Sequence, residues 1–221
     1  MYPKLIGIAG KKRSGKDTAA REIKSLLSPM RIDVVRFADP LKEFCSKIFG
    51  WTLESLDGPQ KEMPDPYWAR EGRPALSRRE AMKRLGTEFG RECHPDVWIR
   101  FALLQTDLLL SGNHVQAVEG MGHGLDYQTR QAAQLVLITD VRFLNEARAI
   151  KAAGGLVVRL HRPQTETPDS HISEAELDTP EFQRSGTDYC DCSIVNDHES
   201  TEGLRTDLRF WLSHRNYPVR T

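Results

Sequence analysis

Short apolar runs alternate along the chain with stretches in which apolar residues recur at helical spacing. The runs predict buried strands, because a parallel strand that is covered on both faces has few polar positions. They lie at residues 4–9, 31–37, 135–138, 156–160 and 192–195. Helices are predicted at residues 15–27, from Pro40 onwards, and at 77–88, 95–110, 144–153 and 200–212. This alternation predicts an α/β layer architecture with a mainly parallel sheet.

Local signals support several of these helices. Pro40 suits the first position of a helix whose apolar face would consist of Leu41, Phe44 and Ile48. Ser77 with Glu80 forms a possible capping box, and the Gly154-Gly155 pair is a stop signal after the helix at 144–153.

Three stretches lack a clear period. Residues 50–76 are rich in glycine, proline and charge, which predicts an irregular surface insertion. The region from 111 to about 133 is polar and contains glycine, and residues 161–181 are polar with prolines, as in a loop or a flap. With no internal repeat, the simplest organisation is one domain over residues 1–221.

Composition narrows the functional classes. Hydrophobic residues make up 39% and charged residues 28%, as in an ordinary globular protein. Lys plus Arg and Asp plus Glu are both 31, so the zero net charge argues against a broad nucleic-acid-binding surface. No apolar run approaches the ~18 residues of a membrane span, and we expect no signal peptide.

The four cysteines, Cys45, Cys93, Cys190 and Cys192, have no zinc-ligand spacing. We interpret them as inert thiols, in keeping with a reducing cytoplasm.

The stretch GIAGKKRSGKDTAA, residues 7–20, carries the first chemical signal. Gly10, four residues and then Gly15-Lys16 follow a predicted strand and open a predicted helix, the context of a phosphate-binding loop. Glycines let backbone N–H groups face a phosphate, and the helix N-terminus adds positive potential. Lys16 supplies a charge that can reach the β- and γ-phosphates.

Asp17 departs from the usual loop, which has Ser or Thr at this position to bind magnesium. A carboxylate can hold Mg²⁺ directly or through water. Thr18 comes one residue late for that role, but its hydroxyl could bind a phosphate oxygen. The sequence therefore predicts a nucleotide site of a variant kind.

The loop RSGKDTAA resembles that of the deoxynucleoside monophosphate kinases of large bacteriophages, and further stretches resemble the same family in the same order. They are ADPLKEF (38–44), RREAMKRLGTEFGRECHPDVWIRF (78–101), TDVRFLNEARAIKAAGGLVVRLHRP (139–163), SHISEAELD (170–178) and CSIVND (192–197). Residues 50–76 and 111–134 match least.

The resemblance implies a P-loop kinase-like three-layer fold with a helical substrate-binding insertion at about 38–111 and a lid at about 161–180. It also implies transfer of the ATP γ-phosphate to a deoxynucleoside monophosphate with Mg²⁺. The implied nucleotide-binding residues are Gly10, Arg13, Ser14, Gly15, Lys16, Asp17 and Thr18. The implied substrate-binding residues are Leu41, Lys42, Arg79, Gly86, Thr87, Trp98, Asp140, Arg142 and Glu146. Lys16, Asp140, Arg142 and Arg162 would be catalytic, with Asp17 and Asp140 at the metal.

The chemistry of these residues fits phosphoryl transfer, which needs cations around the phosphates, a metal and exclusion of water. Asp140 ends a predicted strand, where a parallel sheet presents its ligand-binding edge, although it could simply cap the next helix. Arg142 could instead form a surface ion pair. Arg162 would stabilise the transferred phosphoryl group, or remain solvated.

Other matched residues also have simpler interpretations. Trp98 could lie against the base of the bound nucleotide, or it could belong to the hydrophobic core. Gly86 could mark a place where the backbone approaches the nucleotide closely, or it could be a helix C-cap. His171 and Glu174 match the resemblance and could equally cap a loop.

Two alternative functions stay open. One is a P-loop kinase for another small phosphorylated acceptor, such as phosphomevalonate or dephospho-coenzyme A, and the other is an inactive protein that binds ATP without transfer. The expected partners are small molecules, with neither nucleic acid nor membrane, in the cytoplasm (the host's, if the chain is of phage origin). The base preference and a homodimer also stay open.

Overall fold

Five parallel strands form the central sheet of the chain. The computed structural model describes residues 2–117, 125–129, 131–163, 175–198 and 200–220. In spatial order the strands are β2 (Ile32–Arg36), β5 (Leu135–Val141), β1 (Leu5–Gly10), β6 (Leu156–His161) and β7 (Cys192–Val195). Each neighbouring pair is parallel. The predicted α/β fold with a parallel sheet is confirmed.

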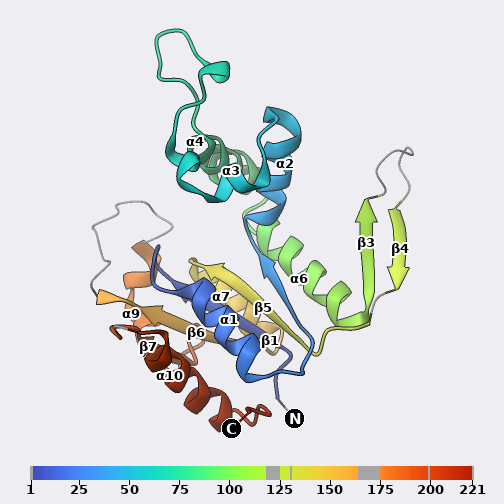
Figure 1. Ribbon diagram of the computed structural model, residues 1–221, viewed down its shortest axis with the longest axis vertical. Coiled ribbons are helices and arrows are strands. Elements are labelled where there is room, and N and C mark those ends of the chain that lie inside the picture. Colours follow the sequence, from blue (N-terminus) through green and yellow to red (C-terminus); the bar gives the residue numbers. More distant parts are fainter. Residues whose placement is uncertain (1, 118–124, 130, 164–174, 199, 221) are drawn as a thin grey trace. The chain divides into compact units, whose positions relative to one another are not determined.

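The chain divides into two compact units, which Figure 1 shows in sequence colours. Unit 1 comprises Met1–Arg36 and Ala102–Thr221, and unit 2 is Phe37–Phe101. Besides the sheet, unit 1 contains α1 (Lys16–Leu26), α7 (Leu144–Ala152), η5 (Glu176–Asp178), α9 (Pro180–Gln183) and α10 (Thr201–His214). The helix α6 (Val97–Ser111) contains the boundary between the units.

Helices cover both faces of the sheet in unit 1. Ile6 and Ile8 of β1 are buried in a core cluster with residues of α1 and α10, which pack side by side (Figure 1). Gly7 points to the opposite face, where a Cβ atom would lie 2.7 Å from Cδ1 of Ile150 in α7. Because successive side chains of a strand alternate between faces, these contacts establish three layers.

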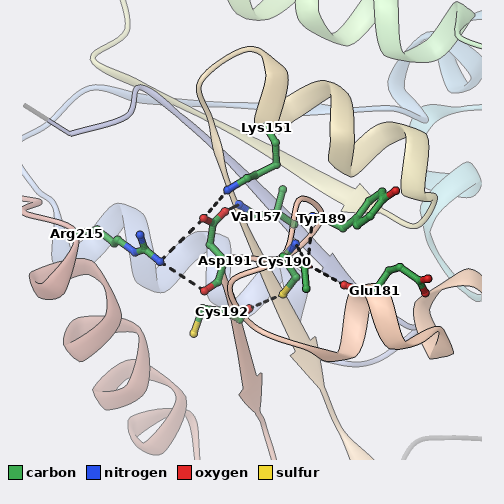
Figure 2. Close-up of polar contacts among 9 residues, drawn as sticks. Lys151, Val157, Glu181, Tyr189, Cys190, Asp191, Cys192 and Arg215 are labelled. Carbon is green, nitrogen blue, oxygen red and sulfur yellow. Dashed lines mark hydrogen bonds and ion pairs between the residues drawn. The ribbon is translucent and has the colours of Figure 1, made fainter.

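A carboxylate joins the start of β7 to its neighbours (Figure 2). Asp191 accepts a hydrogen bond from the backbone N–H of Val157 at 2.8 Å and pairs with Lys151 of α7 at 2.5 Å. Arg215, which follows α10, lies 4.0 Å from the same carboxylate. Val157 and Asp191 lie at the beginnings of their strands. This network therefore stabilises the edge of the sheet where the parallel strands begin.

Unit 2 consists of helices and helical turns. Its elements are α2 (Asp39–Phe49), α3 (Leu53–Asp57), η1 (Pro59–Glu62), η2 (Pro66–Trp68), α4 (Arg78–Lys83), the π-helical segment η3 (Arg84–Gly90) and α5 (Arg91–Cys93). Ser77 caps α4, because its hydroxyl accepts the N–H of Glu80 at 3.2 Å.

We expected an irregular insertion on the surface at residues 50–76, and this expectation is wrong for Trp51 and Leu56, which are buried. Trp51 and Leu56 are buried beside Cys45 of α2 and residues of α4. Trp51 stacks on Phe49 with ring centroids 4.5 Å apart and donates its indole N–H to Asp65 at 2.6 Å. Large aromatic side chains bury enough area to order a segment that lacks hydrophobic periodicity.

The sequence did not indicate the hairpin in the region from 111 to 133. Its strands β3 (Asn113–Ala117) and β4 (Leu125–Thr129) pair antiparallel and form a separate two-stranded sheet. In neither strand do apolar and polar residues alternate regularly, so hydrophobic periodicity did not predict these strands. In the described part of the chain, no helix has the length and apolar character needed to cross a membrane.

Candidate functional site

The predicted phosphate-binding loop, called the phosphate loop below, leaves the central strand at Gly10 and enters α1 at Lys16. Arg13 and Gly15 have positive φ angles, 65° and 100°, so the loop turns back on itself. A Cβ atom at Gly10 would lie 2.4 Å from the hydroxyl of Ser14 and 2.6 Å from a backbone oxygen of β6. Only glycine therefore fits where the loop begins.

Lys16 lies across this loop with its side chain 7% exposed. Its Nζ donates hydrogen bonds to the backbone oxygens of Gly10 and Lys11, each at 2.7 Å. The same Nζ lies 3.8 Å from a carboxylate oxygen of Asp140. The predicted phosphate-binding cation is thus buried in the loop and close to a carboxylate from the neighbouring strand.

A bulge near the end of β5 places Asp140. Gly7 pairs with Ile138 and Ala9 with Val141, so β5 has two residues, Thr139 and Asp140, opposite one residue of β1. Asp140 has a φ of 65°, a conformation that Asp tolerates better than most residues. Bulges redirect side chains and recur beside active sites. Here the bulge brings the carboxylate next to the phosphate loop.

Arg142 follows the bulge, and its guanidinium lies 3.8 Å from the Asp140 oxygen that Lys16 also approaches. Glu146 is 3% exposed and accepts the backbone N–H groups of Arg142 at 2.8 Å and Phe143 at 3.1 Å. Glu146 therefore holds the turn that carries Arg142. Its predicted contact with substrate stays a prediction.

The donors around the loop fit a magnesium ion. Mg²⁺ in phosphoryl-transfer sites is usually held by one or two carboxylates together with phosphate oxygens and water. Asp140 provides one partly exposed carboxylate beside Lys16, and Asp17 is exposed in the first turn of α1. Within the described residues, no cluster of three or more His, Cys, Asp or Glu forms a closed metal cage.

One hydroxyl group lies in this loop, at Ser14, and a second lies in the first turn of α1, at Thr18. Ser14 is buried, and its Oγ has no hydrogen-bond partner within the described part of the chain. A buried polar atom without a partner is costly, so a ligand oxygen at this position would satisfy it. Thr18 is half-buried in α1.

Asn196 supports the loop, a role that the sequence analysis missed. Its side-chain amide donates to the backbone oxygen of Ser14 at 2.9 Å, and its backbone N–H donates to the backbone oxygen of His161 at 2.7 Å. A Cβ atom at Gly15 would lie 2.5 Å from this amide nitrogen. The signal was present: Asn196 directly follows the last strand, at the edge where the phosphate loop lies.

Arg162 follows β6 and is half-buried. Leu160 pairs with Gly10, so the chain leaves β6 beside the phosphate loop. Most of the expected lid, with His171 and Glu174, lies outside the described residues.

Ion pairs engage the predicted phosphate-binding cations of unit 2. The Nζ of Lys42 lies 2.6 Å from Asp57 and 3.9 Å from Asp39, and its side chain is 12% exposed. Arg79 pairs with Glu62 near the surface. An acceptor phosphate would have to compete with these carboxylates or rearrange them.

The segment η3 contains the predicted substrate residues Gly86 and Thr87, and the predicted residues Leu41 of α2 and Trp98 of α6 contact it. Trp98 donates its indole N–H to the backbone oxygen of Gly86 at 2.8 Å, and its ring lies against Gly90. Leu41 packs on Gly86, where a Cβ atom would be 3.0 Å from its Cδ1, and Thr87 is half-buried. These contacts make Trp98 and Leu41 packing partners of a π-helical turn, an arrangement found frequently at functional sites.

The buried cysteines have the properties of inert thiols. Burial raises the pKa of Cys45 and that of Cys190 to about 11, so both are protonated at neutral pH. Burial also raises the pKa of Cys192. A thiol, unlike a thiolate, is a poor nucleophile.

Comparison with known proteins decides the family. No family model matches the chain. A protein of Acanthamoeba polyphaga mimivirus, described as "Putative deoxynucleotide monophosphate kinase", is 32% identical over an alignment of 184 positions that covers 78% of this chain and 81% of that protein. The chain belongs to the deoxynucleotide monophosphate kinase family. Membership in this kinase family agrees with the resemblance seen in the phosphate loop and the later motifs.

Three solved structures resemble this chain at lower sequence identity than the viral protein does. TT1252 from Thermus thermophilus is 18% identical with a TM-score of 0.46, covering 97% of this chain and 98% of its own. The tunicamycin resistance protein of Deinococcus radiodurans is 14% identical with a TM-score of 0.44, covering 100% and 99%. Dephospho-CoA kinase from Campylobacter jejuni is 12% identical with a TM-score of 0.41, covering 96% and 97%.

Proposed function

We propose that the chain transfers the γ-phosphate of ATP to a deoxynucleoside 5′-monophosphate. An oxygen of the acceptor's 5′-phosphate forms a bond to the γ-phosphorus, while the bond from that phosphorus to the β,γ-bridging oxygen breaks. ADP leaves with the electron pair, and the acceptor becomes a diphosphate. The acceptor phosphate is largely ionised at neutral pH, so the step needs no side-chain base.

The convergence of Lys16, Asp140 and Arg142 is the observation that carries the proposal. Two cations lie 3.8 Å from one carboxylate oxygen, beside a glycine loop at the carboxyl ends of two neighbouring strands. Lys16 and the loop N–H groups would hold the donor phosphates. Arg142 would bind phosphate in a bidentate manner. A pre-set cluster of this kind stabilises charge that develops during phosphoryl transfer.

Other residues would complete the proposed reaction. Asp140 and Asp17 would hold Mg²⁺, which neutralises phosphate charge when bound. Lys42 and Arg79 of unit 2 would bind the acceptor phosphate, as the family resemblance implies. Arg162 would act on the transferred phosphoryl group.

A coupled ADP-release assay tests this proposal. ATP and Mg²⁺ are combined with dAMP, dGMP, dCMP or dTMP, and with the ribose forms. We expect release that depends on one or more deoxynucleotides, and a fall of at least about 10²-fold in the Lys16→Ala variant, because an electrostatic contact to the transferring group is lost. Lys24→Ala, an exposed lysine of α1, is the matched control.

Each negative outcome has a distinct meaning. ATP binding without release for any nucleotide would overturn the proposal. Release with a non-nucleotide phosphorylated acceptor would indicate the small-molecule kinase. No release with any acceptor, in protein that is folded and binds ATP, would indicate the inactive nucleotide-binding protein.

A further inference from the structure

The short helix η5 is anchored in the core of unit 1. Leu177, its middle residue, is fully buried, as is Phe182 of the following helix α9. The hydroxyl of Thr179 donates to the backbone oxygen of Glu176 at 2.8 Å, and the amide of Gln183 donates to that of Asp178 at 2.8 Å. The backbone of η5 is therefore fixed, and two carboxylates flank its buried leucine.

The first of these carboxylates contacts the start of α7. Glu176 accepts the backbone N–H of Leu144 at 2.6 Å. This N–H is one of the helix-terminal donors that lack an intrahelical partner, and Phe143, the residue before it, has no side-chain acceptor. With Glu146, which accepts from Arg142 and Phe143, two carboxylates bind three successive N–H groups. Those groups belong to the turn that carries Arg142.

The second carboxylate contacts the phosphate loop. Asp178 pairs with the Nζ of Lys11 at 2.7 Å. The backbone oxygen of Lys11 in turn accepts a hydrogen bond from Lys16 at 2.7 Å. One anchored element thus contacts both the loop with Lys16 and the turn with Arg142.

We propose that Glu176 is a positioning residue for the phosphate site, with Asp178 as its counterpart on the loop. The function of this pair rests on the proposed phosphoryl transfer. Glu176 fixes the N-terminus of α7 and thereby the position of Arg142 relative to Asp140 and Lys16. Because a misplacement of about 1 Å can slow a reaction by 10²-fold, such fixing acts on the chemical step more than on binding.

Steady-state kinetics on three variants test the role of Glu176. In Glu176→Ala the N–H of Leu144 loses its acceptor, and we expect kcat to fall roughly tenfold or more while both KM values change less than about threefold. Glu176→Gln keeps an acceptor oxygen without the charge and should recover most of kcat. Asp188→Ala removes an exposed carboxylate 12 residues further along the chain, and its kcat and KM values should equal those of the parent chain.

Amide hydrogen exchange provides a readout that needs no activity. Exchange in a peptide that covers residues 141–147 should accelerate in Glu176→Ala and not in Asp188→Ala, because only the first opens the helix start. Unchanged kcat, or a loss that is equal in the Ala and Gln variants and follows the folded fraction, would overturn the proposal. So would unchanged exchange. A parent chain without activity, combined with accelerated exchange in Glu176→Ala, would refute the proposed reaction and retain the positioning role.

Discussion

Asn196 stabilises the phosphate loop from outside it, through one buried hydrogen bond to the backbone oxygen of Ser14. In Asn196→Ala this oxygen loses its donor, which costs about 1–3 kcal/mol when the group is buried. We expect ATP to bind about tenfold more weakly, because the loop loses the support that pre-forms it. Calorimetric titration with ATP measures the change.

The neighbouring Asp197→Ala variant is the matched control for that experiment, since its side chain is 60% exposed. Equal ATP affinity in Asn196→Ala and the parent chain would show that the loop keeps its shape without the amide.

Packing between β1 and α7 operates at the scale of elements. A methyl group at Gly7 would meet Cδ1 of Ile150 at 2.7 Å, closer than carbon atoms pack. Gly7→Ala should therefore lower the free energy of unfolding by about 1–3 kcal/mol through overpacking. Urea denaturation measures it.

The double variant Gly7→Ala/Ile150→Val separates overpacking from a general loss of strand stability. Valine lacks the Cδ1 atom, so the double variant should be more stable than the sum of the single effects predicts. Additive effects would locate the strain elsewhere.

Helix α2 shows what a periodic pattern does and does not establish. Leu41, Phe44 and Ile48 share a face, as predicted, yet Phe44 is 46% and Ile48 57% exposed. The buried residue of α2 is instead Cys45, in the aromatic cluster that includes Trp51. Periodicity shows which residues point the same way, whereas burial depends on which other elements pack there.

At the scale of the whole chain, the two units differ in how their stability can be followed. Trp51, Trp68 and Trp98 belong to unit 2, and Trp211 belongs to unit 1. Intrinsic fluorescence therefore reports mainly on unit 2. Hydrogen bonds from Trp51 and from the Tyr67 amide, with the charge of Arg78, lower the pKa of Asp65 below its usual value of 3.8.

This pKa shift predicts an acid-sensitive unit 2. A carboxyl whose pKa is lowered by folding stabilises the fold fully above its unfolded pKa, and this stabilisation is lost as pH falls through the folded value. The fluorescence-detected urea midpoint should thus decrease as the pH falls below about 5, towards and through the lowered pKa of Asp65. The decrease should be smaller in Asp65→Asn. An identical pH dependence in that variant would contradict the assignment to Asp65.

The sequence by itself determined the order of the five strands of the central sheet and of the longer helices, and it predicted the loop at Gly10–Lys16 and the phosphate-binding role of Lys16. These features depend on local periodicity and on residue types at fixed spacing, which the chain carries whatever its tertiary packing. It also identified Asp140 and Arg142 as candidates, because the resemblance to the kinase family implies both and because Asp140 ends a predicted buried strand.

Only the tertiary structure decided how these residues meet. The bulge that turns Asp140 towards Lys16 requires β1 as a neighbour, and the supports from Asn196 and Glu176 come from segments far away in the sequence. Likewise, Trp51 and Trp68 of the segment 50–76 pack in a cluster with residues of α2 and α4. Such contacts depend on which strands pair and which faces are covered, and no local pattern encodes that choice.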